Sequence, residues 1–181
     1  MGRRQTHYEH AFRAFLIERG VPFVAVDEAR RALLGSDAAV LKTQLGSDKP
    51  RTLKAFDFLL YGTPNLLVEL KGRKLAAGST RLENWVTDDD VDSLRRWQRL
   101  FGDGYVGAFA FVYRCEGEPP APLFEQAWIH RDRWYAMRAV GVDAYAERMR
   151  VRSAKWRTVS LASKSFDEIS GPLIATAGSP G

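Results

Sequence analysis

Two carboxylates and a lysine lie close together in one segment of the chain. Asp57 is followed twelve positions later by Glu69, and Lys71 comes two residues after that. Carboxylate oxygens, joined by a strand carbonyl, form the hard oxygen site that Mg²⁺ prefers. A lysine beside such a site can orient or deprotonate an attacking water and offset the charge of a phosphate. The combination predicts metal-dependent hydrolysis of a phosphate ester, provided that the side chains converge.

The alternation of residues in this segment predicts that they do converge. Glu69 and Lys71 are two residues apart, so in a strand they point to the same face. A hairpin loop centred on Thr63 or Pro64 places Asp57 opposite one of them. The other face is then apolar, which fixes the register, because a slip by one residue would push charges into the core. That face comprises Phe56, Phe58 and Leu60 on the first strand and Leu66, Val68 and Leu70 on the second.

Asp57, eleven intervening residues and the sequence Glu69-Leu70-Lys71 resemble the motif of the PD-(D/E)XK nuclease superfamily. The resemblance implies that Asp57, Glu69 and the Leu70 carbonyl bind the metal and that Lys71 assists the water. Phe56 stands where the family name has a proline, a departure that the family commonly tolerates. An acid-x-Lys pattern is also typical of a surface strand with alternating charges, so the motif depends on its context.

A helix is predicted over residues 6–19, and its Glu9 is a further candidate. In the superfamily a glutamate on the first helix often reaches the metal, and the resemblance gives Glu9 that role. The alternative is structural, because Thr6-x-x-Glu9 is also a capping box that closes the start of the helix. Both interpretations stay open on the sequence.

A second helix is predicted to start at Thr87, and its Gln98 shares an apolar face with Val91, Leu94 and Phe101. An amide on a buried face needs a hydrogen-bonding partner. Several branches of the superfamily place a glutamine on this helix to support the active site, and Gln98 resembles it. The alternative is a glutamine at the edge of the apolar stripe.

Basic residues flank the motif and predict a polyanionic partner. The chain contains 27 lysines and arginines, with a net charge of +5, which favours a nucleic acid. Arg73 and Lys74 extend the second strand, Lys54 precedes the first, and His7 lies on the first helix. These four residues are predicted to contact nucleic acid, and the resemblance makes DNA the expected partner while leaving RNA open.

The predicted order of elements is helix, strand, two hairpin strands, helix and a strand buried on both faces. This is the α-β-β-β-α-β core of the restriction-endonuclease-like α/β fold, with a mixed central sheet flanked by helices, and the resemblance covers residues 6–113. C-terminal α+β additions are expected after it. They comprise a strand at Phe124–His130, a helix at 143–152, a strand at Trp156–Leu161 and a last helical turn from Ser165.

The length of 181 residues and the composition indicate one domain over residues 1–170, with 171–181 as a flexible tail. The first ten residues lack the apolar segment of a signal peptide, and no run is long enough to cross a bilayer, so we expect a cytoplasmic protein with no membrane partner. The single cysteine excludes an internal disulfide.

The expected function is a Mg²⁺- or Mn²⁺-dependent nuclease that hydrolyses phosphodiester bonds in DNA, including structured or branched DNA. Holliday-junction resolvases are the superfamily members nearest in size. Such enzymes cut two symmetric strands, so a homodimer is compatible with this expectation, although the sequence indicates no interface. The alternative is a nucleic-acid-binding module that keeps the fold without the chemistry.

Overall fold

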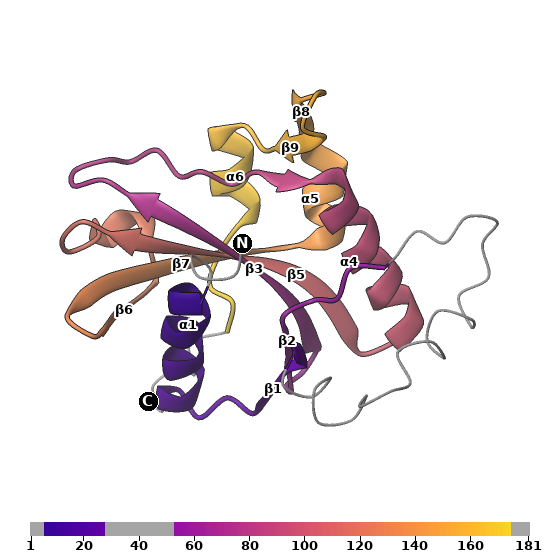
Figure 1. Cartoon of the computed structure of the whole chain (residues 1–181), viewed down its shortest axis with the longest axis horizontal. Helices are drawn as coiled ribbons and strands as arrows, with labels where there is room; N and C mark the ends of the chain where they lie inside the picture. Colours follow the sequence, from indigo (N-terminus) through magenta and orange to yellow (C-terminus); the bar gives the residue numbers. More distant parts are fainter. Residues whose placement is uncertain (1–5, 28–52, 175–181) are drawn as a thin grey trace.

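The computed structural model describes residues 6–27 and 53–174. Figure 1 shows a curled central sheet that carries α1 on one face and α4, α5 and α6 on the other. The helices are α1 (Thr6–Glu18), α4 (Asp88–Phe101), α5 (Val142–Arg148) and α6 (Ser163–Ile169), with a 3₁₀ turn at Ala121–Leu123. The strands are β1 (Phe23–Ala25), β2 (Phe58–Leu60), β3 (Asn65–Leu75), β4 (Val86–Thr87), β5 (Tyr105–Cys115), β6 (Gln126–His130), β7 (Arg133–Gly141), β8 (Arg150–Ser153) and β9 (Thr158–Ser160).

The central sheet has six strands in the order β1-β2-β3-β5-β7-β6. Strands β3 and β5 are parallel and all other neighbours are antiparallel, so the sheet is mixed. The order α1, β1, β2, β3, α4, β5 is the predicted one, and it confirms the restriction-endonuclease-like core. A second sheet, with the order β4-β9-β8, lies beside it and was not predicted.

The C-terminal additions follow the prediction in part. Strands β6 and β9 and helix α6 lie where they were expected. The helix expected over 143–152 ends at Arg148, and its last residues form β8 instead. Strand β7 was not assigned from the sequence, although it pairs with both β5 and β6.

Strand β5 separates two hydrophobic clusters, as its continuous apolar sequence predicted. Its side chains alternate between the faces of the sheet. Ala108, Ala110 and Val112 pack in the cluster of α1, whereas Phe109, Phe111 and Tyr113 pack in the cluster of α4, α5 and α6. Both faces are therefore covered, which confirms the predicted layering.

The β2–β3 hairpin has the predicted register. Phe58 pairs with Val68 and Leu60 with Leu66, so the loop is centred on Thr63. The prediction was wrong for Phe56, which packs on the α4 face, with its ring 5.5 Å from that of Trp97. Strand β2 begins only at Phe58, so the alternation of faces does not extend back to Phe56.

Strand β3 extends well beyond its pairing with β2. It pairs with β5 along its whole length from Asn65 to Leu75, but with β2 only over Leu66–Val68. Within the described residues, the later part of β3 therefore has a free edge on the β2 side. We call residues 69–75 on this side the free edge of β3.

Helix α1 is fastened against this strand by Tyr8. Its hydroxyl donates a hydrogen bond to the Arg73 carbonyl at 2.7 Å. A methyl group on Gly72 would come within 2.3–2.6 Å of the Tyr8 ring, so only glycine lets the ring lie against the strand. This close contact sets the position of α1 over β3.

The segment predicted as a flexible tail begins with packed residues. Gly171 forms a β-bridge with Ala139, and Leu173 is buried in the α1 cluster. The side chain of Gln126 accepts from the Leu173 N–H and donates to the Ile174 carbonyl. Residues 175–181 of the predicted tail lie outside the described residues. In the described part of the chain, none of the helices is both long and apolar enough to cross a membrane.

Candidate active site

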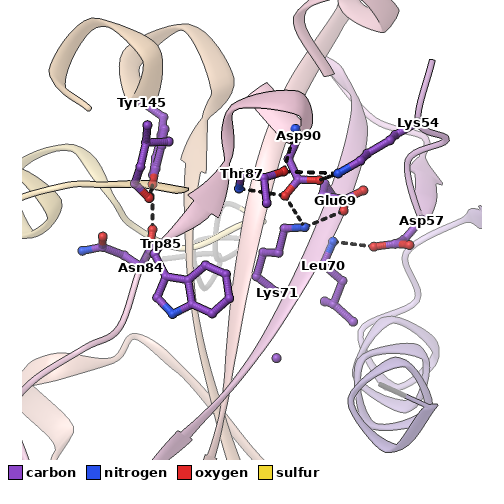
Figure 2. Close-up of polar contacts among 12 residues, drawn as sticks. Lys54, Asp57, Glu69, Leu70, Lys71, Asn84, Trp85, Thr87, Asp90 and Tyr145 are labelled. Atoms are coloured by element: carbon purple, nitrogen blue, oxygen red, sulfur yellow. Dashed lines mark hydrogen bonds and ion pairs between the residues drawn. The ribbon is translucent and has the colours of Figure 1, made fainter. Parts of the chain in front are cut away.

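Asp57 lies at the entry to β2 and is held against β3. Its backbone N–H donates to the Val68 carbonyl at 2.9 Å. Its side chain accepts a hydrogen bond from the Leu70 N–H, with Oδ2 at 2.7 Å (Figure 2). The hairpin register places Asp57 across from Glu69. The predicted approach of these two carboxyl groups is therefore present in the structure.

Lys71 lies between two carboxylates. Its Nζ is 2.8 Å from Glu69 Oε1 and 2.9 Å from Asp90 Oδ2. The three side chains are only 14%, 16% and 7% exposed, respectively, so this cluster is largely shielded from water. Ion pairs on both sides fix the ammonium group of Lys71 at the start of the free edge of β3.

Asp90 was not predicted as part of the site. It is the third residue of α4 and closes a capping box, in which its Oδ2 accepts from the Thr87 N–H at 3.0 Å and its own N–H donates to Thr87 Oγ1 at 3.2 Å. Asp90 Oδ1 also accepts from Lys54 Nζ at 3.1 Å. The capping pattern Thr87-x-x-Asp90 was visible in the sequence, but the docking of α4 on β3 was not.

Within the described residues Asp57 has no ion pair, and Glu69 shares the Lys71 ammonium with Asp90. Burial, and then the nearby Glu69 charge, raise the pKa of Asp57 far above its ordinary range. Burial also raises the pKa of Glu69, although the Lys71 ammonium opposes the shift. Two buried carboxyl groups with raised pKa values are stabilised by a cation that approaches both.

For Lys71 and Asp90, by contrast, neighbouring charges and hydrogen bonds outweigh the effect of burial on the pKa. Burial alone would lower the pKa of Lys71, but the charges of Glu69 and Asp90 outweigh it and raise this pKa. Burial alone would raise the pKa of Asp90, but the Lys71 charge and the hydrogen bonds from Thr87 and Lys71 lower it to about 2. Lys71 is therefore a fixed ammonium group and Asp90 a fixed carboxylate.

The donor set fits a hard divalent cation in charge and in ligand type. Asp57 and Glu69 supply carboxylate oxygens, and Mg²⁺ is commonly bound through one or two carboxylates while it keeps several waters. In residues 6–27 and 53–174, no three or more His, Cys, Asp or Glu side chains form a ready metal-binding group. A cation here would accordingly take its remaining ligands from water, substrate or the Leu70 carbonyl.

The comparisons with known proteins find a similarity of structure and none of sequence. No protein-family model matches the chain, and no curated protein matches its sequence. The structure is similar to that of Hjc, a Holliday junction resolvase from the archaeal hyperthermophile Archaeoglobus fulgidus. The identity is 13%, the TM-score is 0.49, and the match covers 91% of this chain and 93% of that one. The fold assignment rests on strand order and pairing.

Glu9 approaches the site from α1. Its charge contributes to the raised pKa of Asp57, after burial and the charge of Glu69. No hydrogen bond or ion pair within the described residues joins Glu9 to either carboxylate. The alternative capping role depends on the Thr6 side chain, which lies outside the described side chains. The metal-binding role of Glu9 stays a prediction.

Gln98 does not contact the predicted catalytic residues in the described structure. Its Oε1 accepts from the Gly107 N–H at 2.8 Å, and its Nε2 donates to Asp143 Oδ2 at 2.7 Å. Both ends of the amide are thus used to join α4 to β5 and α5. These contacts satisfy the half-buried amide, and support of the active site by Gln98 stays a prediction.

Two of the predicted nucleic-acid contacts have partners inside the protein. Lys54 is 48% exposed and forms an ion pair with Asp90 at the rim of the site. Arg73 is half-buried, donates to the carbonyls of Gly72 and Trp85, and lies with its guanidinium carbon 4.2 Å from the Trp85 ring centroid. Arg73 lies two residues after Lys71 and four after Glu69, so its side chain points to the same face of β3, the face that α4 covers. Its contact with nucleic acid stays a prediction.

The other two residues that were predicted to contact nucleic acid, Lys74 and His7, lie on the α1 face of the sheet, beyond the site. Lys74 is exposed, and it lies opposite Arg114 in the register of the parallel strands β3 and β5. His7 Nδ1 is 3.2 Å from the Tyr135 hydroxyl. Burial lowers the pKa of His7, and the charges of Arg114, Arg133 and Lys74 lower it further. These cations gather at the end of the sheet, where a phosphate contact by Lys74 or His7 stays a prediction.

Proposed function

We propose that this protein is a metal-dependent nuclease that hydrolyses phosphodiester bonds in DNA. The observation that carries the proposal is the arrangement of Asp57, Glu69 and Lys71 at the free edge of β3. The two carboxyl groups have raised pKa values and so favour a cation, and the lysine beside them is fixed as an ammonium group. A surface strand with alternating charges would bury none of these groups.

Each residue has a distinct role in this proposal. Asp57 and Glu69 hold Mg²⁺ or Mn²⁺, with the Leu70 carbonyl as a further ligand. When bound, such a cation lowers the pKa of a water and offsets the charge that develops on the phosphate. Lys71 donates a hydrogen bond that orients the attacking water. Because ion pairs hold its ammonium group on two sides, Lys71 acts as a hydrogen-bond donor and not as a general base.

Asp90 keeps Lys71 in position while Glu69 binds the cation. In the structure Lys71 shares its charge between Glu69 and Asp90. A cation competes for Glu69, which would leave Lys71 free to rotate away if Asp90 were absent. The Asp90 oxygen at 2.9 Å preserves one ion pair and leaves the other donors of the ammonium group for water. Asp90 is therefore a positioning residue.

The test is cleavage of a substrate panel in the presence of Mg²⁺ or Mn²⁺ and in the presence of a chelator. The panel contains supercoiled plasmid, linear duplex, single strand, four-way junction and an RNA strand. We expect metal-dependent cutting of DNA that falls by about 100-fold or more in Lys71→Ala. Lys164→Ala, which removes an exposed lysine on α6, is the matched control.

Metal binding is measured separately by calorimetric titration with Mn²⁺. We expect one saturable site in the wild type that Glu69→Gln removes. If the folded, Mn²⁺-bound protein binds DNA but cuts no substrate, the nuclease proposal is refuted and a nucleic-acid-binding module takes its place. Sedimentation of the free protein tests the predicted homodimer in the same preparation.

A further inference from the structure

The hairpin formed by β8 and β9 exposes an aromatic side chain among basic ones. Trp156 in its turn is 70% exposed, and Val151 on β8 is 75% exposed. The eleven residues from Arg150 to Ser160 include four basic residues and no acidic one. This short element thus combines a flat apolar surface with concentrated positive charge, and none of the roles given above uses it.

The turn that carries Trp156 is well defined. The Trp156 N–H donates to Ser153 Oγ at 3.3 Å, and the Arg157 N–H donates to the Ala154 carbonyl at 3.3 Å. Arg157 has a φ of 47°, which is uncommon for a residue other than glycine. The Lys155 ammonium lies 5.4 Å from the centroid of the Trp156 ring. The turn therefore holds the indole away from the core with the Lys155 ammonium beside it.

This hairpin is attached directly to the candidate active site. Strand β9 pairs with β4, with Thr158 opposite Thr87, and the Arg157 carbonyl accepts from the Asp88 N–H at 3.0 Å. Thr87 Oγ1 in turn accepts from Lys54 Nζ at 3.2 Å, inside the site. With a strand spacing near 4.8 Å and a rise of about 3.3 Å per residue, the Trp156 backbone lies on the order of 10 Å from Thr87.

A surface cavity of about 230 Å³ lies between the hairpin and the site. It is lined by Leu53, Lys54, Asp89, Asp92, Ser93, Arg96 and Arg157. Lys54 and Ser93 also line a smaller cavity that reaches Glu69 and Asp90. The larger cavity therefore lies between the surroundings of Glu69 and Arg157, the residue next to Trp156 in the hairpin.

We propose that the β8–β9 hairpin binds a DNA strand next to the cleaved bond and that Trp156 stacks on one of its unpaired bases. The proposal rests on the proposed function, because it takes the substrate to be a DNA strand. An indole face suits a base, and base–aromatic stacking does not depend on sequence. The basic residues of the hairpin suit phosphates, and the absence of acidic residues in it argues against a basic protein partner.

The geometry also limits which nucleotide is bound. Even at the short rise of a duplex, about 3.4 Å per nucleotide along the axis, the distance of about 10 Å between Thr87 and Trp156 is spanned by a few nucleotides. Bases in an intact duplex are covered by their neighbours and cannot stack on a side chain without being unstacked. The expected ligand is thus single-stranded or branched DNA with an unpaired base a few nucleotides from the cut.

The experiment measures binding by fluorescence anisotropy in a chelator, with a short labelled single strand and the matching duplex. Trp156→Ala should weaken binding of the single strand by about 5- to 100-fold, whereas Trp156→Phe keeps most of the affinity. The duplex should be much less affected. Ile129→Ala removes another exposed apolar side chain, on β6, and should change neither affinity.

A second measurement uses the charge of the turn. Lys155→Ala should reduce the slope of log K against log salt by about one, as expected for one lost phosphate contact. Replacing the stacked base by an abasic site should weaken the wild type and leave Trp156→Ala unchanged. Circular dichroism and sedimentation of each variant establish that the fold and the oligomeric state are preserved.

The outcomes separate this inference from the nuclease proposal. If Trp156→Ala and Ile129→Ala bind the single strand equally well, or if Trp156→Ala weakens the duplex as much as the single strand, stacking is refuted even when the wild type cuts DNA. Loss of self-association in Trp156→Ala, without loss of affinity, would make the indole a contact between copies of the chain. A wild type that cuts nothing but binds in a Trp156-dependent manner refutes the nuclease and supports the hairpin.

Discussion

The role of Asp90 leads to a quantitative prediction for the variant Asp90→Asn. Asparagine keeps the size of the side chain and an oxygen that accepts from the Thr87 N–H, but it removes the charge that faces Lys71 and Lys54. The pKa of Asp90 is about 2, against an ordinary value of 3.8. A difference of nearly two pKa units corresponds to about 2 kcal/mol of folding free energy at neutral pH.

The pH dependence follows from the direction of the shift. The pKa of Asp90 is lower in the folded than in the unfolded protein, so its contribution is complete above pH 4 and is lost as the pH falls toward 2. Urea unfolding followed by circular dichroism should show Asp90→Asn less stable than wild type by about 2 kcal/mol at pH 7. The difference should shrink below pH 4. For a domain of this size the variant should melt about 4–8 °C lower at neutral pH.

Asp89→Asn is the matched control for this experiment. Asp89 precedes Asp90 in the first turn of α4, is 48% exposed, and forms an exposed ion pair with Arg157 at 3.2 Å. An exposed pair of this kind contributes about 0.5 kcal/mol or less, so Asp89→Asn should stay near wild type. A deficit in Asp90→Asn that is the same at every pH would refute the electrostatic reasoning and indicate a lost capping or packing contact. The absence of any deficit would refute it as well.

Two further predictions concern the neighbouring elements. Gly72→Ala should destabilise the protein by about 1–3 kcal/mol, since the added methyl group meets the Tyr8 ring. This loss of stability, measured by thermal melting, should be smaller in a Tyr8→Ala background. Gly141→Ala is the control, because a methyl group added there meets no atom within 4 Å. Asp57→Asn should be as stable as wild type or more stable at neutral pH without metal, because burial and Glu69 raise the pKa of Asp57 in the folded state. The rise in melting temperature on adding Mg²⁺ should disappear in Asp57→Asn; a persistent rise would place the metal elsewhere.

The central hairpin could be predicted because two independent constraints agree on it. Side-chain parity puts Glu69 and Lys71 on one face, and the apolar residues of the other face fix the register. The observed pairing of Phe58 with Val68 is one of the two registers that this pattern allows, the one centred on Thr63. Parity also applies to Arg73, which shares the face of Lys71, but the sequence does not show that Trp85 folds over that face and covers the guanidinium.

The missed features depend on contacts between segments far apart in sequence. Asp90 joins the site because α4 packs against β3, and a cap residue carries no signal of the partner that its free oxygen meets. Strand β7 contains Arg133 and Arg138, which interrupt its apolar pattern, although Arg138 is accommodated by an ion pair with Asp167 at 2.9 Å. The Phe56 side chain changed face because β2 is only three residues long. Local periodicity cannot reveal any of these contacts.

The charges of the site explain why a third acid is compatible with a metal site. When ionised, Asp57, Glu69 and Asp90 exceed Lys54 and Lys71 by one negative charge, and the excess falls on the two carboxyl groups whose pKa values are raised. Asp90 does not add to that excess at the proposed metal position, because both of its oxygens face lysines. A divalent cation reverses the sign to one positive charge, and a bound phosphodiester then neutralises it. The proposed cation and a phosphodiester together would therefore neutralise the charge of these five groups, as expected if both are ligands of the site.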